Sequence, residues 1–161
     1  MLNPGFPKIS IGEGFYPQAI ATANAIDQIE RSFHDFHEPL VQSLREVIIT
    51  SVRTNFNVEG RPAWQELAES TVRKRGTSHP ILTNTGALKS ESTNEQNWTV
   101  TTDDVSLTGL DSAVPYAAYN QAGTSKMPAR EFVSLQERDM TEIERVFSEW
   151  IDRKIAEGGF R

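Results

Sequence analysis

Apolar side chains recur at every third or fourth position through residues 18–56, and this spacing predicts helix. Such a stripe covers one face of a helix and leaves the charged side chains on the other face. Pro39 lies inside the run, where it removes a backbone hydrogen bond. We therefore expect either a kinked long helix or two helices, the second beginning near His37 with Pro39 in its first turn. The stripe consists of Ile26, Ile29, Phe33, Phe36, Leu40, Leu44, Ile48 and Val52.

The spacing of apolar residues changes from helical to alternating near the middle of the chain. Trp98 and Val100 alternate with threonines, and Val105 and Leu107 alternate with small polar residues. Asp103-Asp104 separates the two runs and favours a turn, so this region predicts a β-hairpin. The strands expected in addition to this hairpin are residues 88–93 and 128–135.

Shorter helical segments and one long helix complete the expected secondary structure. Residues 63–75 predict either a short helix or a loop followed by a helix, with Trp64, Leu67 and Val72 turned inward. Residues 115–123 predict a single helical turn that ends at Gly123. Near the end of the chain, residues 139–155 carry a broad apolar face and predict an amphipathic helix.

These elements predict a fold that mixes helices and strands, with two amphipathic helices around several strands. The composition does not change abruptly along the chain, which favours one folded domain. The expected boundaries are residues 1–17 for the extended N-terminal arm, 18–156 for the α+β domain and 157–161 for a C-terminal tail.

The N-terminal arm combines helix-breaking residues with large apolar side chains. Its prolines and glycines exclude a helix. Its apolar side chains would gain from burial, so we expect the arm to pack on its own domain or on a neighbouring subunit; the alternative is a mobile terminus. The apolar residues in question are Phe6, Ile9, Ile11 and Phe15.

Composition and charge exclude several kinds of chemistry. The 161 residues include no cysteine, which excludes disulfides, thiolate nucleophiles and cysteine-bound zinc. The net charge of −6 argues against general binding to nucleic acid or anionic membranes, although it leaves room for a local basic patch. No secretory signal and no membrane-spanning run is found, so we expect a protein made and kept in a cytoplasm.

Motifs that carry catalysis are missing from the sequence. It contains no nucleophile elbow, zinc-protease helix, phosphate-binding P-loop or dinucleotide fingerprint. His34 and His37 are spaced to share a helix face, but a solvated pair is the expected interpretation because no third ligand accompanies them. We therefore predict no catalytic, cofactor-binding or metal-binding residue, and no enzyme activity.

One basic cluster, Arg73-Lys74-Arg75, leaves three interpretations open. Its cations could contact the phosphates of DNA. They could instead be a solvated helix end, where positive charge suits the helix dipole. They could also form ion pairs with acidic faces of another subunit, and unlike surfaces that meet head to tail close into rings. Candidate partners for such ion pairs are Glu142, Glu144 and Glu149, in the more acidic half of the chain.

Short motifs follow one another in a definite order between residues 55 and 132. They are Asn55-Phe56, Glu59-Gly60-x-Pro62-x-Trp64-x-x-Leu67, Thr71-x-x-Lys74, Ile81-Leu82-x-x-Thr85-Gly86-x-Leu88, Tyr116-Ala117-x-Tyr119-x-Gln121-x-Gly123 and Pro128-Ala129-Arg130-x-Phe132. In this order they resemble the tailed-phage virion morphogenesis family, whose members are called tail completion, neck or head–tail joining proteins. The resemblance covers about residues 20 to 155. Asn120-Gln121 stands where the family pattern has His-Gln, and Lys126-Met127 precedes the Pro-Ala-Arg motif.

The resemblance implies an α+β domain, in which a long N-terminal helix and a C-terminal helix pack on a small antiparallel β-sheet, with extended terminal arms. It also implies a structural protein that forms a homo-oligomeric ring, expected to be a hexamer, at the head–tail junction. Such a ring joins the tail to the DNA-filled capsid and contacts other neck, connector, tail-tube or sheath proteins, with passing contact to DNA in the channel. It would be assembled in the host cytoplasm and reside in the virion. The alternative within the same class is a tail-terminator ring that caps the tail tube. A DNA-binding adaptor and a packaging hydrolase are the less favoured alternatives.

Certain motif positions are expected at subunit or partner interfaces, together with the apolar residues of the N-terminal arm. For each of them, packing or a turn within the domain is the competing interpretation: the two glycines could supply positive φ angles and the two tyrosines could be buried. The positions are Thr85, Gly86, Tyr116, Tyr119, Gln121, Gly123, Pro128, Ala129 and Arg130.

Overall fold

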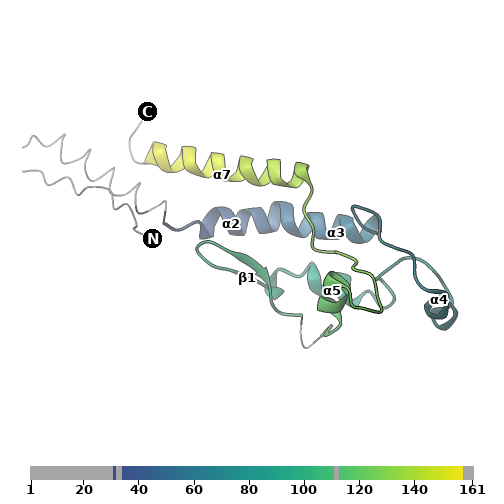
Figure 1. Cartoon of the computed structure of the whole chain (residues 1–161). Helices are drawn as coiled ribbons and strands as arrows, with labels where there is room; N and C mark the ends of the chain where they lie inside the picture. Colours follow the sequence, from purple (N-terminus) through teal and green to yellow (C-terminus); the bar gives the residue numbers. More distant parts are fainter. Residues whose placement is uncertain (1–30, 32–33, 111–112, 158–161) are drawn as a thin grey trace, which may run out of the picture.

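A long helical rod forms the centre of the molecule. The computed structural model describes residue 31 and residues 34–110 and 113–157. In it, α2 (His37–Ser43), the π-helical segment η1 (Leu44–Ile48) and α3 (Ile49–Asn57) follow one another as one continuous rod (Figure 1). The helix that begins at His37 confirms the predicted start of the second helix, and the helix expected before it lies outside the described residues. Pro39 occupies the first turn, where its missing N–H has no intrahelical partner to lose.

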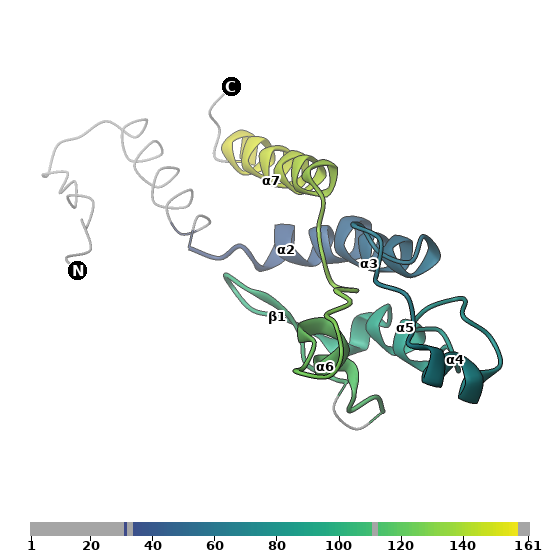
Figure 2. The ribbon, with the colours of Figure 1, turned by 45° about the vertical axis from the view of Figure 1, so that its right-hand side comes forward.

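The C-terminal helix α7 (Glu137–Glu157) lies along one side of this rod (Figures 1 and 2). Val146 and Trp150 are the buried residues of α7. The ring of Phe36, just before α2, lies 5.9 Å from the ring of Phe147 and 5.8 Å from that of Trp150. The predicted C-terminal helix is therefore confirmed, and it is slightly longer at both ends than expected.

A small lobe of short elements packs on the other side of α3 (Figure 2). The β-hairpin is present as predicted, with Trp98 opposite Leu107 and Val100 opposite Val105 in an antiparallel pair. The fold is α+β. The elements of the lobe are α4 (Glu69–Arg75), α5 (Ala87–Ser92), the 3-10 turn η2 (Glu95–Asn97), β1 (Trp98–Val100), β2 (Val105–Leu107) and α6 (Ala117–Ala122).

One apolar core joins the lobe to α3. Phe56 lies at its centre, with ring centroids 5.7 Å from Trp64 and 5.6 Å from Phe132. Burying such large side chains stabilises each by about 1.5–3 kcal/mol relative to exposure. The core consists of Val52, Phe56, Trp64, Ile81, Leu88, Leu110, Val114, Ala117 and Phe132.

The predicted strand at residues 88–93 is wrong, because this segment is the helix α5. Leu88 and Ser92 are buried, whereas Ser90, which would share their face in a strand, is exposed; on a helix, Leu88 and Ser92 share a face that Ser90 does not. The Ser92 hydroxyl donates to the Leu88 carbonyl at 2.6 Å, which removes the cost of burying it. The burial pattern of this segment therefore follows the helical period and lacks the alternation of a strand.

The predicted strand at residues 128–135 is also wrong, because side chains bind the backbone groups that a strand partner would take. The Gln121 amide accepts from the N–H groups of Phe132 and Val133 and donates to the Val133 carbonyl. The Asn55 amide donates to the carbonyls of Phe132 and Ser134. The backbone groups of this segment therefore have hydrogen-bond partners without a neighbouring strand.

Some predictions lie outside the described residues. They concern the N-terminal arm with Phe6, Ile9, Ile11 and Phe15, the helical pattern before residue 31, and the tail beyond Glu157.

A tight loop after α3 returns the chain to the core at Trp64. Gly60 has φ +101°, and its N–H donates to the Asn55 carbonyl at 2.7 Å. A Cβ atom on Gly60 would lie 2.5 Å from Cδ1 of the Trp64 indole. The glycine is therefore required both for its backbone angle and for the space that the indole occupies.

Replacing Gly60 by alanine is expected to lower the free energy of unfolding by about 1–3 kcal/mol more than replacing Gly76 does. Gly76 also has a positive φ, but nothing lies within 4 Å of a Cβ built there, so Gly76→Ala tests the backbone angle alone. Urea unfolding monitored by circular dichroism measures both. Equal losses for the two variants would show that the Trp64 contact does not constrain the loop.

Candidate interaction surfaces

Asn55 is the centre of a polar network that fixes the positions of the other motif residues. Its side chain is 0% exposed and donates to the carbonyls of Phe132 and Ser134, both at 3.0 Å. Its amide oxygen accepts from Nε of Arg61 at 2.7 Å. Arg61 continues the network to the hydroxyl of Ser51, at 2.6 Å. A buried amide with all these partners fixes α3 against two distant segments.

Arg130 is part of this internal framework, in contrast to its expected role at an interface. Its side chain is buried, with the residue 4% exposed, and it donates to the carbonyls of Gln65 and Glu66, both at 2.9 Å. Burial lowers the pKa of Arg130, and the nearby charge of Glu66 acts in the opposite direction. The interface prediction for Arg130 is therefore corrected: its guanidinium group holds the loop that contains Trp64.

The short helix α6 is held in place by Gln121 and ends at Gly123. Gln121 makes the backbone bonds to residues 132 and 133 described above. Gly123 has φ +71°, and a Cβ there would lie 2.6 Å from the Ala129 nitrogen. Gly86 likewise has a positive φ at the start of α5, so the turn interpretation of both glycines is confirmed. Gln121 and the glycines thus serve the fold itself.

The outward face of α6 carries two exposed tyrosines. Tyr116 is 44% exposed and Tyr119 is 61% exposed, so the alternative that they are buried aromatics is wrong. They are three residues apart and share one face of the helix. Exposed tyrosines suit binding because they supply large contact area with few rotatable bonds. Among the other predicted interface positions, Thr85 and Ala129 are exposed and Pro128 is half-buried.

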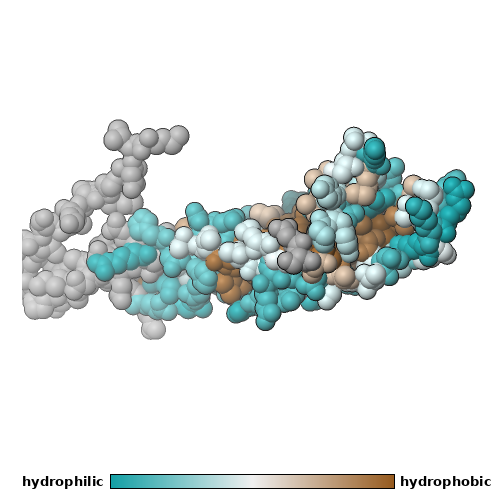
Figure 3. Space-filling view, turned by 90° about the horizontal axis from the view of Figure 1, so that it is seen from below, coloured by the Kyte–Doolittle hydropathy of each residue, from teal (hydrophilic) through white to brown (hydrophobic). Residues whose placement is uncertain are grey.

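Seen from below, the molecule shows apolar areas separated by hydrophilic surface (Figure 3). Within the described residues, the large apolar side chains most exposed to solvent are Val58, Tyr116, Tyr119, Met140 and Ile155.

The basic cluster on α4 divides into bound and unbound cations. Arg75 donates to the Pro80 carbonyl at 2.6 Å and so closes its own loop. Arg73 and Lys74 are exposed, and neither makes a hydrogen bond or ion pair with any described residue. The helix α4 lies at one end of the molecule (Figures 1 and 2). Only two of the three predicted phosphate-binding residues are therefore available to a partner.

Most of the acidic side chains of α7 are already paired. Arg145 donates to Glu149 at 2.7 Å and to Glu142 at 3.0 Å, and it lies 3.6 Å from Glu46. The hydrogen bonds that Arg145 donates to the carboxylates of Glu149 and Glu142 raise its pKa. Of the three acids proposed as ion-pair partners for another subunit, only Glu144 remains unpaired among the described residues. The spacing of three and four residues around Arg145 was a readable signal for these pairs.

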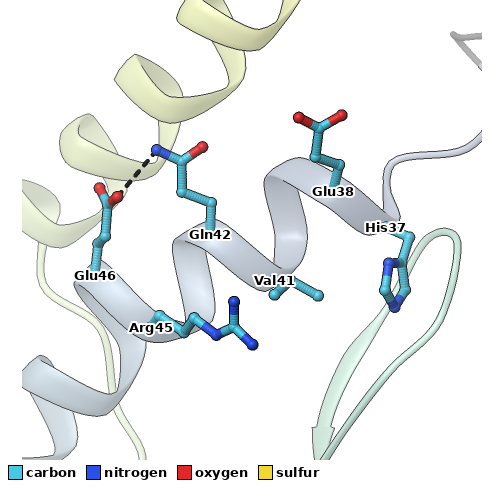
Figure 4. Close-up of a pocket in the computed structure, with 6 residues that line it drawn as sticks. All are labelled: His37, Glu38, Val41, Gln42, Arg45 and Glu46. Carbon is cyan, nitrogen blue, oxygen red and sulfur yellow. Dashed lines mark hydrogen bonds between the residues drawn. The ribbon is translucent and has the colours of Figure 1, made fainter.

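A shallow groove of about 430 Å³ runs along the face of α2 and η1 (Figure 4). Its polar side chains are used within the chain: Gln42 donates to Glu46, and Arg45 pairs with Glu95 at 2.7 Å. The Arg45 hydrogen bond lowers the pKa of Glu95. Figure 4 shows these side chains spread along the helix without converging on one point. The residues that line the groove are His37, Glu38, Val41, Gln42, Arg45 and Glu46.

Glu38, at one end of the groove, ties the start of α2 to α7. It accepts from the Trp150 indole at 3.1 Å and from Arg153 at 2.7 Å, with Lys154 at 3.5 Å. Burial acts to raise the pKa of Glu38, but the Trp150 hydrogen bond and the two cations outweigh it, so the pKa is lowered. No local sequence pattern indicates this contact, because its partners lie more than a hundred residues apart.

Two further searches concern the described part of the chain. No group of three or more side chains suited to holding a metal ion comes together there. No helix in those ranges combines the length and the apolar character needed to cross a membrane.

No protein family, curated protein or solved structure matches the chain. The family resemblance therefore rests on the sequence motifs and their order.

Glu38→Gln is expected to lower the free energy of unfolding at pH 7 by less than about 1 kcal/mol, because the ion pair is largely exposed. The folded pKa of Glu38 is lowered, so its stabilising effect is present above the ordinary glutamate pKa of about 4.3 and is lost as the pH falls through the lowered value. The difference between parent and variant should thus vanish in acid. Unfolding curves recorded between pH 3 and 7, a range of about four pH units, measure this difference in the free energy of unfolding. Glu131→Gln, at an exposed loop, is the control, and a difference that persists in acid would contradict this role.

Tyr116→Ser with Tyr119→Ser should change the free energy of unfolding by less than about 1 kcal/mol, because both side chains are exposed. Gln121→Ala should lower it by about 2–3 kcal/mol, because it leaves backbone groups of residues 132 and 133 unpaired. Chemical unfolding compares the two directly. A large loss in the tyrosine variant would mean that those side chains support the fold.

Proposed function

We propose that the protein is a structural subunit of a ring at the head–tail junction of a tailed phage, where it completes the neck and joins the tail to the capsid. In this role it acts through surface complementarity and carries out no catalysis. Its partners are further copies of itself and neck, connector, tail-tube or sheath proteins, and the ring is expected to be a hexamer.

The observation that carries the proposal is the way the motif residues divide in space. Asn55, Gln121 and Arg130 belong to distant motifs, yet they form one connected framework under α3. This framework holds α6 so that Tyr116 and Tyr119 face outward. A subunit that acts by binding needs some residues that fix its fold and others that present an aromatic surface, and these motifs supply both.

A tail-terminator ring that caps the tail tube uses the same features and is the alternative within this class. A DNA-binding adaptor is favoured by one observation, the unpaired Arg73 and Lys74 at the end of the molecule. Each would add a phosphate contact and increase the salt dependence of binding.

The purified protein is expected to form rings, alone or with tail-tube or connector protein. Light scattering gives the mass of the assembly and negative-stain imaging gives its shape. The Tyr116→Ser, Tyr119→Ser variant should remain folded but lose assembly, whereas exposed Asn84→Ser is the control that should assemble normally. A monomer that forms no ring under any of these conditions would contradict the proposed function.

Deleting residues 1–15 tests the N-terminal arm in the same assay. If the arm contacts a neighbouring subunit, the deletion should weaken assembly without changing the unfolding of the remaining domain. Assembly equal to that of the full chain would show that the arm does not hold a neighbour.

A further inference from the structure

The unpaired carboxylates of α7 lie together on its outward side. Asp139 is bound to Ser51 and Arg61, and Glu142 and Glu149 are bound to Arg145. By contrast, Glu137, Glu144 and Asp152 are exposed and have no side-chain partner among the described residues. Spacings of seven and eight residues place these three on one side of a helix. The paired and unpaired acids of α7 are therefore separated in space.

The same side of α7 carries apolar side chains that the fold leaves uncovered. Met140 is 47% exposed and Ile155 is 37% exposed. Met140 lies between Glu137 and Glu144, within about one turn of each. The outward α7 face, defined here as Glu137, Met140, Glu144, Asp152 and Ile155, thus combines apolar area with unpaired negative charge.

Complementary charge is found on α4, in another part of the molecule. Arg73 and Lys74 are adjacent, exposed and unpaired, whereas the other cations without a partner in the described ranges are dispersed along the chain. The α3 end of the rod and the lobe separate α4 from most of α7 in both ribbon views (Figures 1 and 2). The cations of α4 therefore cannot neutralise the outward α7 face of their own chain.

We propose that α4 of one copy docks on the outward α7 face of the next copy. Arg73 and Lys74 then pair with Glu144 and Asp152, and the contact reduces the exposure of Met140 and Ile155 at its two ends. The inference rests on the proposed ring function and names its contact. The two surfaces are different, so each copy uses one to contact the preceding subunit and the other to contact the following subunit. Repetition of such a head-to-tail contact closes a ring when the rotation between neighbouring copies divides a full turn.

The expected strength of this contact sets the design of the test. Exposed ion pairs contribute little each, but complementary charge fixes the orientation of partners and speeds their association. Reversing both charges on one surface replaces attraction by repulsion, which has a larger effect than removing them. Restoration by reversal of the other surface then separates a direct contact from a general loss of folding.

The experiment uses the full-length chain in two charge-reversed forms. The basic-surface variant is Arg73→Glu with Lys74→Glu, and the acidic-surface variant is Glu144→Lys with Asp152→Lys. Each alone should raise the protein concentration at half-assembly by about tenfold or more. Mixed in equal amounts they should assemble again, because every α4 then meets an α7 of opposite charge. The chain that carries all four substitutions should assemble alone.

Matched controls carry the same charge changes elsewhere. Arg53→Glu with Lys126→Glu matches the basic-surface variant, and Asp104→Lys with Glu131→Lys matches the acidic-surface variant. Circular dichroism checks folding, and if a reversal variant does not fold, Arg73→Ala with Lys74→Ala and Glu144→Gln replace it, with weaker assembly expected. The controls should assemble like the parent.

The outcomes are distinguishable. If the parent forms rings and the reversal variants do so equally well, this contact is wrong while the ring function stands. If the parent forms no ring at all, the proposed function fails. If the mixture does not recover, the two surfaces do not meet. If loss of Arg73 and Lys74 abolishes salt-sensitive retention on DNA but leaves assembly unchanged, the cations serve DNA and the contact is overturned.

Discussion

The buried side chain of Asn55 is the constraint on which the rest of the structure depends. It is an amide with no access to water, so each of its hydrogen-bonding groups must find a partner inside the protein. Its partners come from the segment before α7 and from Arg61, which in turn contacts Asp139 in the first turn of α7. One side chain on α3 therefore determines where α7 begins and how the lobe lies beneath the rod.

Periodicity was a good guide wherever helix or strand partners supply the hydrogen bonds. It predicted the start of α2 at His37, the hairpin of β1 and β2, and α7, because each shows its apolar face in its spacing. It failed at residues 128–135, where an apolar run resembles a strand but its backbone groups bind Gln121 and Asn55. Such side-chain bonds depend on distant residues meeting in space, which a local pattern does not encode.

The candidate interface residues could be predicted only as a mixed set. Their motifs contain both framework and surface positions, and burial is what separates Arg130 from Tyr119. The charged side chains also form a mixed set. Arg145 pairs with Glu142 and Glu149 at a helical spacing that can be read from the sequence, while the contact of Glu38 with Trp150 forms only when the chain has folded. The side chains available to a partner are thus those that contacts within the chain do not use.

The π-helical segment η1 gives the rod a property that an uninterrupted α-helix lacks. A π-turn accommodates one more residue than an α-turn, so it shifts the angular phase of α2 by about 100° relative to α3. This offset lets α2 direct Glu38 toward α7 while α3 directs Phe56 into the lobe. The rod therefore connects two packing surfaces. The angle between these surfaces depends on the number of residues in η1 more than on their chemical identity.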